Sequence, residues 1–278
     1  MAEIDHDAIS YTALKVLEHR ARDCTIPLAR EMARAAGVQW RSPWAKRFLR
    51  KLVGGKVHSG LYLQLRYDAL SRALAMYRGC AVLELAAGYG TRGIAESAQR
   101  EAYIETDLGN LVARKERVVR SLRGDKHGVN HHFLRLNVTD PDDLQRAASF
   151  ITGLNLVTPL AIIHEGLFMY FSDEEQARVR DGIAGLMRGY RPGAAWLTTD
   201  FSERDIDKSL VQKLMSLKLR RRVGRRLNYF ADNAAVERFL RAGGLQAEWL
   251  PSGADGSARV RAYAEYFRVH RITLRAGR

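Results

Sequence analysis

The sequence predicts a doubly wound α/β fold with a mostly parallel seven-stranded sheet, and three observations support this prediction. Short apolar runs alternate with longer stretches of helical periodicity through residues 79–278, a pattern typical of a parallel sheet covered by helices on both faces. The first run leads directly into a glycine-rich turn, Gly88-Tyr-Gly90. Carboxylate side chains follow two later runs, at Asp107 and Glu165, as expected if ligands bind at the carboxyl edge of the sheet.

The individual elements are predicted from periodicity and from start and stop signals. The expected strands are 81–85, 102–105, 131–136, 158–163, 194–199, 245–250 and 269–274. The expected helices among them cover 91–100, 111–122, 173–187 and 233–242, with a further helix beginning near 140. Asp140 and Pro141 mark that helix start, because Asp is a preferred N-cap and Pro fits the first helical position.

Two segments outside the alternating pattern are also expected to be helical. Residues 1–78 are predicted to form a helical N-terminal extension or cap, in which one helix ends at Gly37. Residues 79–278 form the predicted ligand-binding domain, and 206–230 a basic helical lid inserted in it. The role of its basic stretch, 208–226, stays open between attraction of an anionic substrate and a solvated helix face.

Composition narrows the class of protein. The 278 residues are 46% hydrophobic and 27% charged, which is ordinary for a globular protein. Cys24 and Cys80 are far apart and lack metal-ligand spacing, so we expect no metal site and a reduced, cytoplasmic location. The acidic start lacks the pattern of a signal peptide, and no apolar run approaches the roughly 18 residues that span a bilayer.

The net charge of +14 favours an anionic partner, which can be nucleic acid, a membrane surface or an acidic substrate. The alternative is a basic surface without a specific partner. Because no nucleic-acid-binding module or aromatic stacking stripe is recognisable, we favour a small anionic substrate over nucleic acid. The sequence does not indicate an oligomeric state.

The glycine-rich segment has two interpretations. Gly88 to Gly93 fits G-x-G-x-x-G, which in a dinucleotide-binding fold lets the backbone approach a pyrophosphate. Glu84 lies four residues before Gly88, where it would face that pyrophosphate unfavourably. The same position suits the acid that precedes the Gly-x-Gly turn of methyltransferases using S-adenosylmethionine. We therefore favour S-adenosylmethionine over a nicotinamide dinucleotide.

Further cofactor contacts are expected after the second and third strands. Asp107, with Glu105 as the fallback, is predicted to accept hydrogen bonds from ribose hydroxyls, although either acid can instead cap a helix. Asn137 is placed for the adenine edge or is a turn residue. Together with the turn after the first strand, the predicted cofactor contacts are Ala86, Gly88, Gly90, Glu105, Asp107, Asn137 and Val138.

Several segments resemble the leucine carboxyl methyltransferases, a family that includes bacterial polyketide O-methyltransferases of the tetracenomycin type. The resemblance covers roughly Leu61 to Asp200 and is carried by Glu105-Thr-Asp107-Leu, Ala113-Arg-Lys115 and Ile163-His-Glu165-Gly166-Leu-Phe-Met-Tyr170-Phe. It implies a class I methyltransferase fold. It also implies that Glu165 contacts the methionine end of S-adenosylmethionine and that Tyr170 borders the reacting centre.

The resemblance further implies an arginine before the first strand that binds the cofactor's carboxylate. The family often has R-T-R-x-x-D there, whereas this chain has Leu65-Arg66-Tyr67-Asp68. Arg66 is the expected counterpart.

The candidate catalytic residues are His164, Tyr170 and Asp200. His164 is a candidate base, although a lone histidine at a strand end is often structural. Tyr170 can equally be a core aromatic, and Asp200 can orient substrate or cap the next helix. A carboxylate acceptor is already ionised at neutral pH, whereas a phenol, with a pKa near 10, benefits from a base.

The predicted function is therefore O-methylation of a carboxylate or phenol on a small, polyketide-like molecule. The alternatives are an RNA or protein methyltransferase and a cofactor-binding protein without catalysis.

Overall fold

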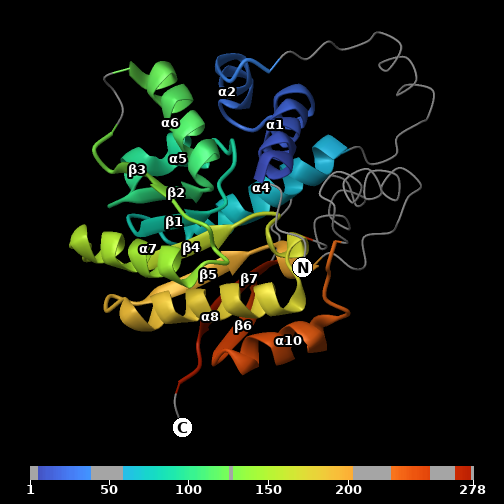
Figure 1. Ribbon diagram of the computed structural model, residues 1–278, viewed down its shortest axis with the longest axis vertical. Helices are drawn as coiled ribbons and strands as arrows, with labels where there is room; N and C mark the ends of the chain where they lie inside the picture. Colours follow the sequence, from blue (N-terminus) through green and yellow to red (C-terminus); the bar gives the residue numbers. More distant parts are fainter. Residues whose placement is uncertain (1–5, 39–58, 125–127, 203–226, 251–266, 277–278) are drawn as a thin grey trace.

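The computed structural model describes residues 6–38, 59–124, 128–202, 227–250 and 267–276 (Figure 1). The predicted basic lid falls almost entirely outside the described residues, as does its stretch 208–226. The strands are β1 (Ala81–Leu85), β2 (Tyr103–Asp107), β3 (His131–Arg135), β4 (Leu160–His164), β5 (Ala194–Thr198), β6 (Leu245–Leu250) and β7 (Val269–Leu274).

These strands form one sheet in the order β3-β2-β1-β4-β5-β7-β6. Strands β1 to β5 are parallel, and β7 is antiparallel to both β5 and β6. The expected doubly wound, mostly parallel seven-stranded sheet is therefore confirmed. The chain order reverses direction between β1 and β4, which places a ligand-binding crevice at the carboxyl ends of these strands.

Helices cover both faces of this sheet (Figure 1). The helices are α1 (His6–Asp23), α2 (Ala29–Ala35), α4 (Ser59–Ala75), α5 (Arg92–Glu96), α6 (Gly109–Arg123), α7 (Pro141–Gly153), α8 (Asp173–Gly189) and α10 (Asn233–Ala242), with short 3-10 turns η1 (Ser97–Gln99), η3 (Phe168–Tyr170) and η4 (Asp200–Ser202). One face carries α7, α8 and α10, and the other carries the remaining helices. None of the helices in the described ranges is long and apolar enough to cross a membrane.

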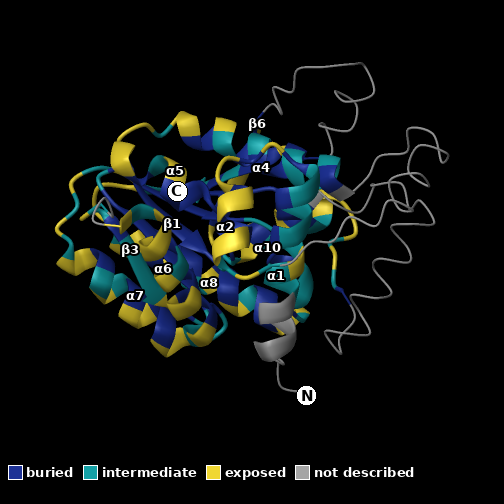
Figure 2. Ribbon diagram, turned by 90° about the horizontal axis from the view of Figure 1, so that it is seen from above, coloured by how far each residue is buried: buried dark blue, intermediate teal, exposed yellow. Residues whose placement is uncertain are grey.

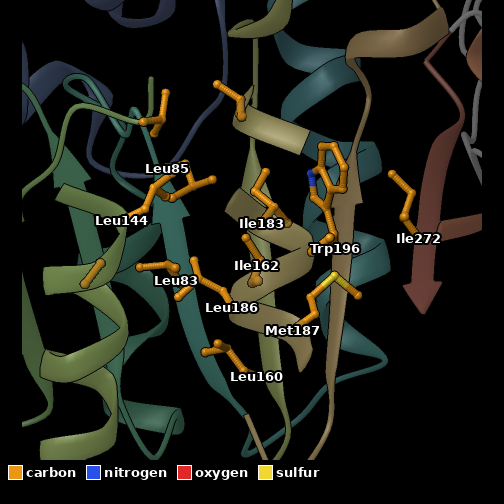
Figure 3. Packing of buried hydrophobic residues seen from close by; sticks show 14 of the residues in the cluster. Leu83, Leu85, Leu144, Leu160, Ile162, Ile183, Leu186, Met187, Trp196 and Ile272 are labelled. Atoms are coloured by element: carbon orange, nitrogen blue, oxygen red, sulfur yellow. The ribbon is translucent and has the colours of Figure 1, made fainter. Parts of the chain in front are cut away.

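The main core lies between the sheet and α8 (Figure 3). Leu83, Ile162 and Trp196 project from β1, β4 and β5 and are fully buried. They belong to the same cluster as Ile183 and Met187 of α8. Burial of each such side chain contributes about 1.5–3 kcal/mol, so the central strands, whose ends carry the site, are held rigidly. Figure 2 shows the exposed residues on the outer sides of the surrounding helices.

The N-terminal helices α1 and α2 pack against helices that cover the other face of the sheet. Helix α1 contacts α2 and α4, and α2 contacts α6. Leu17 of α1 and Met32 of α2 are buried in one cluster with Leu111 of α6. The Thr91 hydroxyl, which lies just after the glycine-rich turn, donates to the Pro27 carbonyl at 2.6 Å. The predicted N-terminal extension is thus attached to the turn that follows β1.

Candidate functional site

An open cavity lies where β1, β2, β3 and β4 end, and α1 forms part of its wall. Its empty space, counted out to the mouth and including open solvent there, is about 1130 Å³. Its lining comprises Thr12, Ala13, Val16, Leu17 and Arg20 of α1, with Glu84, Ala86, Ala87, Gly88, Tyr89, Gly90, Asp107, Leu108, Leu111, Leu136, Asn137, Val138, Glu165, Gly166, Leu167, Tyr170 and Phe171. Most of the cofactor residues predicted from the sequence therefore meet in one cavity.

The turn after β1 presents bare backbone to this cavity. Ala86 has a φ of 50° and Gly88 a φ of 51°, so the chain is left-handed at both positions, a conformation that costs a residue with a Cβ atom about 1–2 kcal/mol. The Gly90 N–H donates to the Ala87 carbonyl at 2.8 Å. A Cβ atom at Gly90 would lie 2.9 Å from that carbonyl oxygen, so the turn requires glycine there.

The third glycine of the motif has a different task. A Cβ atom at Gly93 would overlap the Glu105 carboxylate and lie 2.8 Å from His131 Nε2. Glu105 is fully buried, where it pairs with Lys115 and, at 2.9 Å, with His131. Glu105 does not line the cavity, so Asp107, the last residue of β2, is the acid of this strand that reaches the cavity. Gly93 makes room for a buried ion pair.

Asp107 is held by backbone donors. Its two oxygens accept hydrogen bonds from the Gly88 N–H at 2.7 Å and the Leu108 N–H at 2.8 Å. Each oxygen keeps a further lone pair for a ligand. Burial raises the pKa of Asp107 to about 6, against the opposing effect of the two backbone hydrogen bonds. This carboxylate is therefore costly to keep charged until a ligand donates to it.

Asn137 is a turn residue that also lines the cavity. Its side-chain oxygen accepts from the Thr139 hydroxyl at 2.9 Å, and its backbone N–H donates to Asp143 at 2.7 Å. It therefore fixes the turn after β3 while lining the cavity beside Val138.

A chain of buried charges lies below the glycine-rich turn. Glu165 pairs with Arg20 through one oxygen and with Arg92 through the other, the latter at 3.4 Å. Arg92 also pairs with Glu84 at 3.1 Å, and the Tyr103 hydroxyl donates to Glu84 at 2.6 Å. The side chains of Arg20, Arg92 and Glu165 are only 12%, 2% and 8% exposed.

The basic neighbours of Glu165 and the acidic neighbours of Arg92 favour the ionised forms of these two side chains. Burial raises the pKa of Glu165, but Arg20, Arg66 and Arg92 outweigh it and hold this pKa below its usual value. Burial likewise lowers the pKa of Arg92, and Glu84, Tyr103, Glu165 and Tyr67 together more than reverse that effect. The end of β4 thus presents an anion and a cation side by side to the cavity.

Arg20 and Arg92 were not singled out from the sequence. Arg92 follows Glu84 by eight residues, a local signal that was available in the sequence. Arg20 is 145 residues from its partner Glu165, and no local pattern distinguishes it among the 45 Lys and Arg residues of the chain.

Besides Glu105, the structure places three further predicted contact residues outside the cavity lining. Arg66 pairs with Asp200 at 2.9 Å, and His164 Nδ1 lies 3.1 Å from the same carboxylate. The side chains of Arg66, His164 and Asp200 are 4%, 0% and 3% exposed. This placement differs from the expectation that Arg66 binds the cofactor's carboxylate and that the other two contact substrate. The physical reason is burial: the three groups contact one another beneath the site.

Tyr170 lies on the cavity wall, in η3, beside Leu167 and Phe171. Of the three candidate catalytic residues, it is the one that borders the cavity. Its neighbour Phe168 points into the core, stacked on His164 with ring centroids 5.1 Å apart.

Neither a model of a known protein family nor a curated protein matches the sequence. Solved structures with the same fold do match. A DUF574 family protein from Streptomyces avermitilis has a TM-score of 0.57 at 14% identity, covering 98% of both chains. A putative methyltransferase from Thermobifida fusca has a TM-score of 0.50 at 16% identity, covering 97% of this chain and 94% of its own. PigF with SAH has a TM-score of 0.50 at 13% identity, covering 98% and 71%.

These matches and the strand order show the class I methyltransferase fold.

Proposed function

We propose that this protein is a methyltransferase that uses S-adenosylmethionine to methylate an oxygen of a small organic acid or phenol. One observation carries the proposal: Glu84 and Asp107 flank the Gly88–Gly90 turn within one cavity, on a class I methyltransferase fold. A nucleoside without a diphosphate fits between two carboxylates, whereas a pyrophosphate is repelled by them.

The lining residues are chemically suited to the parts of S-adenosylmethionine. Asp107 is suited to accept from the ribose hydroxyls, and the turn at Asn137 and Val138 is suited to the adenine. The methionine end is a zwitterion, and Arg20 and Glu165 offer the complementary pair of charges. In this proposal Arg20 takes the role that the family resemblance implied for Arg66.

The cofactor, when bound, would supply the methyl carbon that is attached to its sulfonium sulfur. The protein then has to orient the acceptor oxygen in line with that carbon and exclude water. No histidine lines the cavity within the described ranges, which favours a carboxylate acceptor that is ionised without a base. Tyr170 borders the reacting centre and positions the acceptor.

Calorimetry with S-adenosylhomocysteine tests the cofactor. We expect binding by the protein, at least tenfold weaker binding by Asp107→Ala, and no binding of a nicotinamide dinucleotide. An Asp232→Ala variant is the matched control, because Asp232 is the exposed N-cap of α10, away from the cavity. Binding of the dinucleotide in preference to S-adenosylhomocysteine refutes the proposal.

A turnover assay with S-adenosylmethionine and a panel of carboxylic acids and phenols tests the reaction. Release of S-adenosylhomocysteine with a carboxylic acid is the expected result. Methylation of RNA or protein but of no small molecule favours the first alternative. Cofactor binding without any acceptor favours the second, a protein without catalysis.

A further inference from the structure

The Asp200 carboxylate is a meeting point of five hydrogen-bond donors. Its Oδ1 accepts from the Gly166 N–H at 2.6 Å and from Arg66 Nη2 at 2.9 Å. Its Oδ2 accepts from the Leu167 and Phe168 N–H groups at 2.6 and 3.0 Å and lies 3.1 Å from His164 Nδ1. These donors occupy the acceptor sites of a carboxylate, so none remains for a ligand.

Three of the five donors are consecutive backbone N–H groups of the turn between β4 and η3. Gly166 is left-handed, with a φ of 74°, and Leu167 is right-handed, with a φ of −109° and a ψ of −51°. Successive N–H groups in this combination form a concave nest that binds an anion. Here the anion is a side chain of the protein itself, supplied by η4.

The turn that forms this nest is flanked by two residues of the cavity wall. Glu165 precedes the three N–H groups and Tyr170 follows them, and both line the cavity. The space around the turn is filled, because a Cβ atom at Gly166 would lie 3.1 Å from Arg66 Nη2. Asp200 therefore holds the turn that begins directly after Glu165, although Asp200 does not line the cavity.

We propose that Asp200, together with Arg66 and His164, is a positioning residue that fixes the β4–η3 turn so that Glu165 faces the methionine end of the cofactor. This rests on the proposed function for the identity of the ligand. The geometry of the turn does not depend on it.

The test compares two ligands that differ only at the methionine end. In Asp200→Asn the amide offers one acceptor oxygen where the carboxylate offers two, so part of the nest loses its anion. We expect the Kd for S-adenosylhomocysteine to rise about tenfold, the equivalent of one charged hydrogen bond, and the Kd for adenosine to change less than about twofold. Glu165→Gln is expected to show the same selective loss. The double variant is expected to bind S-adenosylhomocysteine about as weakly as the weaker-binding of the two single variants, because Asp200 acts through Glu165.

Amide exchange provides a readout that is independent of the cofactor. The amides of 166–168 are expected to exchange faster in Asp200→Asn, while those of β4 stay protected. Asp232→Asn is the control, with the same acid-to-amide change at an N-cap where Asn is equally suitable; it is expected to leave both ligands and these amides unaffected.

If Asp200→Asn does not fold, Gly166→Ala provides a second test. It disturbs the same turn while residue 200 remains an aspartate, and it must give the same selective loss of affinity for S-adenosylhomocysteine. Equal weakening of both ligands, or unchanged exchange at 166–168, overturns the positioning role. If the amides of 166–168 exchange faster in Asp200→Asn but the unaltered protein does not bind S-adenosylhomocysteine, the proposed cofactor is refuted and the positioning role is not.

Discussion

The pKa of Asp107 makes cofactor affinity depend on pH. Without ligand this pKa is about 6, and hydroxyl donors favour the charged form, so binding lowers the pKa and releases a proton near pH 6. We expect affinity for S-adenosylhomocysteine to be constant above about pH 7 and to fall by up to tenfold per unit below about pH 6. Calorimetry across this range measures it, and Asp107→Asn should show a flat profile. A flat profile for the unaltered protein would contradict this role.

In the ligand-free protein, the raised pKa of Asp107 makes stability change with pH in the opposite direction to cofactor affinity. The folded pKa of about 6 lies above the usual 3.8, so the folded state binds more protons between these values. The contribution of Asp107 to stability is full below about pH 3.8 and is lost as the pH rises through 6. A bound ligand offsets that loss.

Gly93 illustrates a residue whose role is packing, although it belongs to a binding motif. Gly93→Ala places a methyl group against the buried Glu105–His131 pair, and we expect it to reduce the free energy of unfolding by about 2–4 kcal/mol. Gly185→Ala is the control: Gly185 is exposed in α8 with nothing near its absent Cβ, so alanine should raise stability by about 0.5–1 kcal/mol. Urea unfolding measures both, and equal effects of the two changes would refute the packing argument.

At the scale of elements, α1 is the wall of the cavity that a bound cofactor should stabilise. Its residues Thr12, Val16 and Arg20 line the cavity, and Arg20 reaches Glu165 across it. Saturation with S-adenosylhomocysteine should therefore slow amide exchange in 12–20 at least tenfold. Helix α10 does not line the cavity and serves as the internal control. Unchanged exchange in α1 at saturating ligand would show that the helix does not cover the site.

Several strands and helix starts could be predicted because short sequence patterns specify them. The strands β6 and β7 coincide with the expected 245–250 and 269–274, and Asp140 caps α7 with Pro141 at its start as expected. Short apolar runs and capping chemistry are set by a few neighbouring residues, so one sequence reveals them. The acids at the strand ends were placed for the same reason, since parallel strands bring their carboxyl ends to one edge.

The remaining assignments depended on which way a side chain faces and on partners distant in sequence. Successive residues at a strand end point to opposite faces, so a turn that presents Glu165 to the cavity directs His164 into the core. Arg66 and Asp200 are 134 residues apart, and their pairing is set by how α4 packs on the sheet. Arg20 reached the site because α1 folds over it. None of these facts has a local sequence signature.

The net charge of the whole molecule predicts how substrate binding depends on salt concentration. A net charge of +14 attracts anions from beyond contact distance, and salt screens that attraction within about 10 Å at about 0.1 M. If the acceptor is a carboxylate, its KM should rise several-fold between about 0.02 M and about 0.3 M salt. S-adenosylhomocysteine has no net charge, so its Kd should change less than about twofold and serves as the internal reference. A phenol that is neutral in solution should follow the reference. If salt shifts all three constants equally, the overall charge does not select the substrate, and the preference for an anion has to come from contacts inside the cavity such as Arg20.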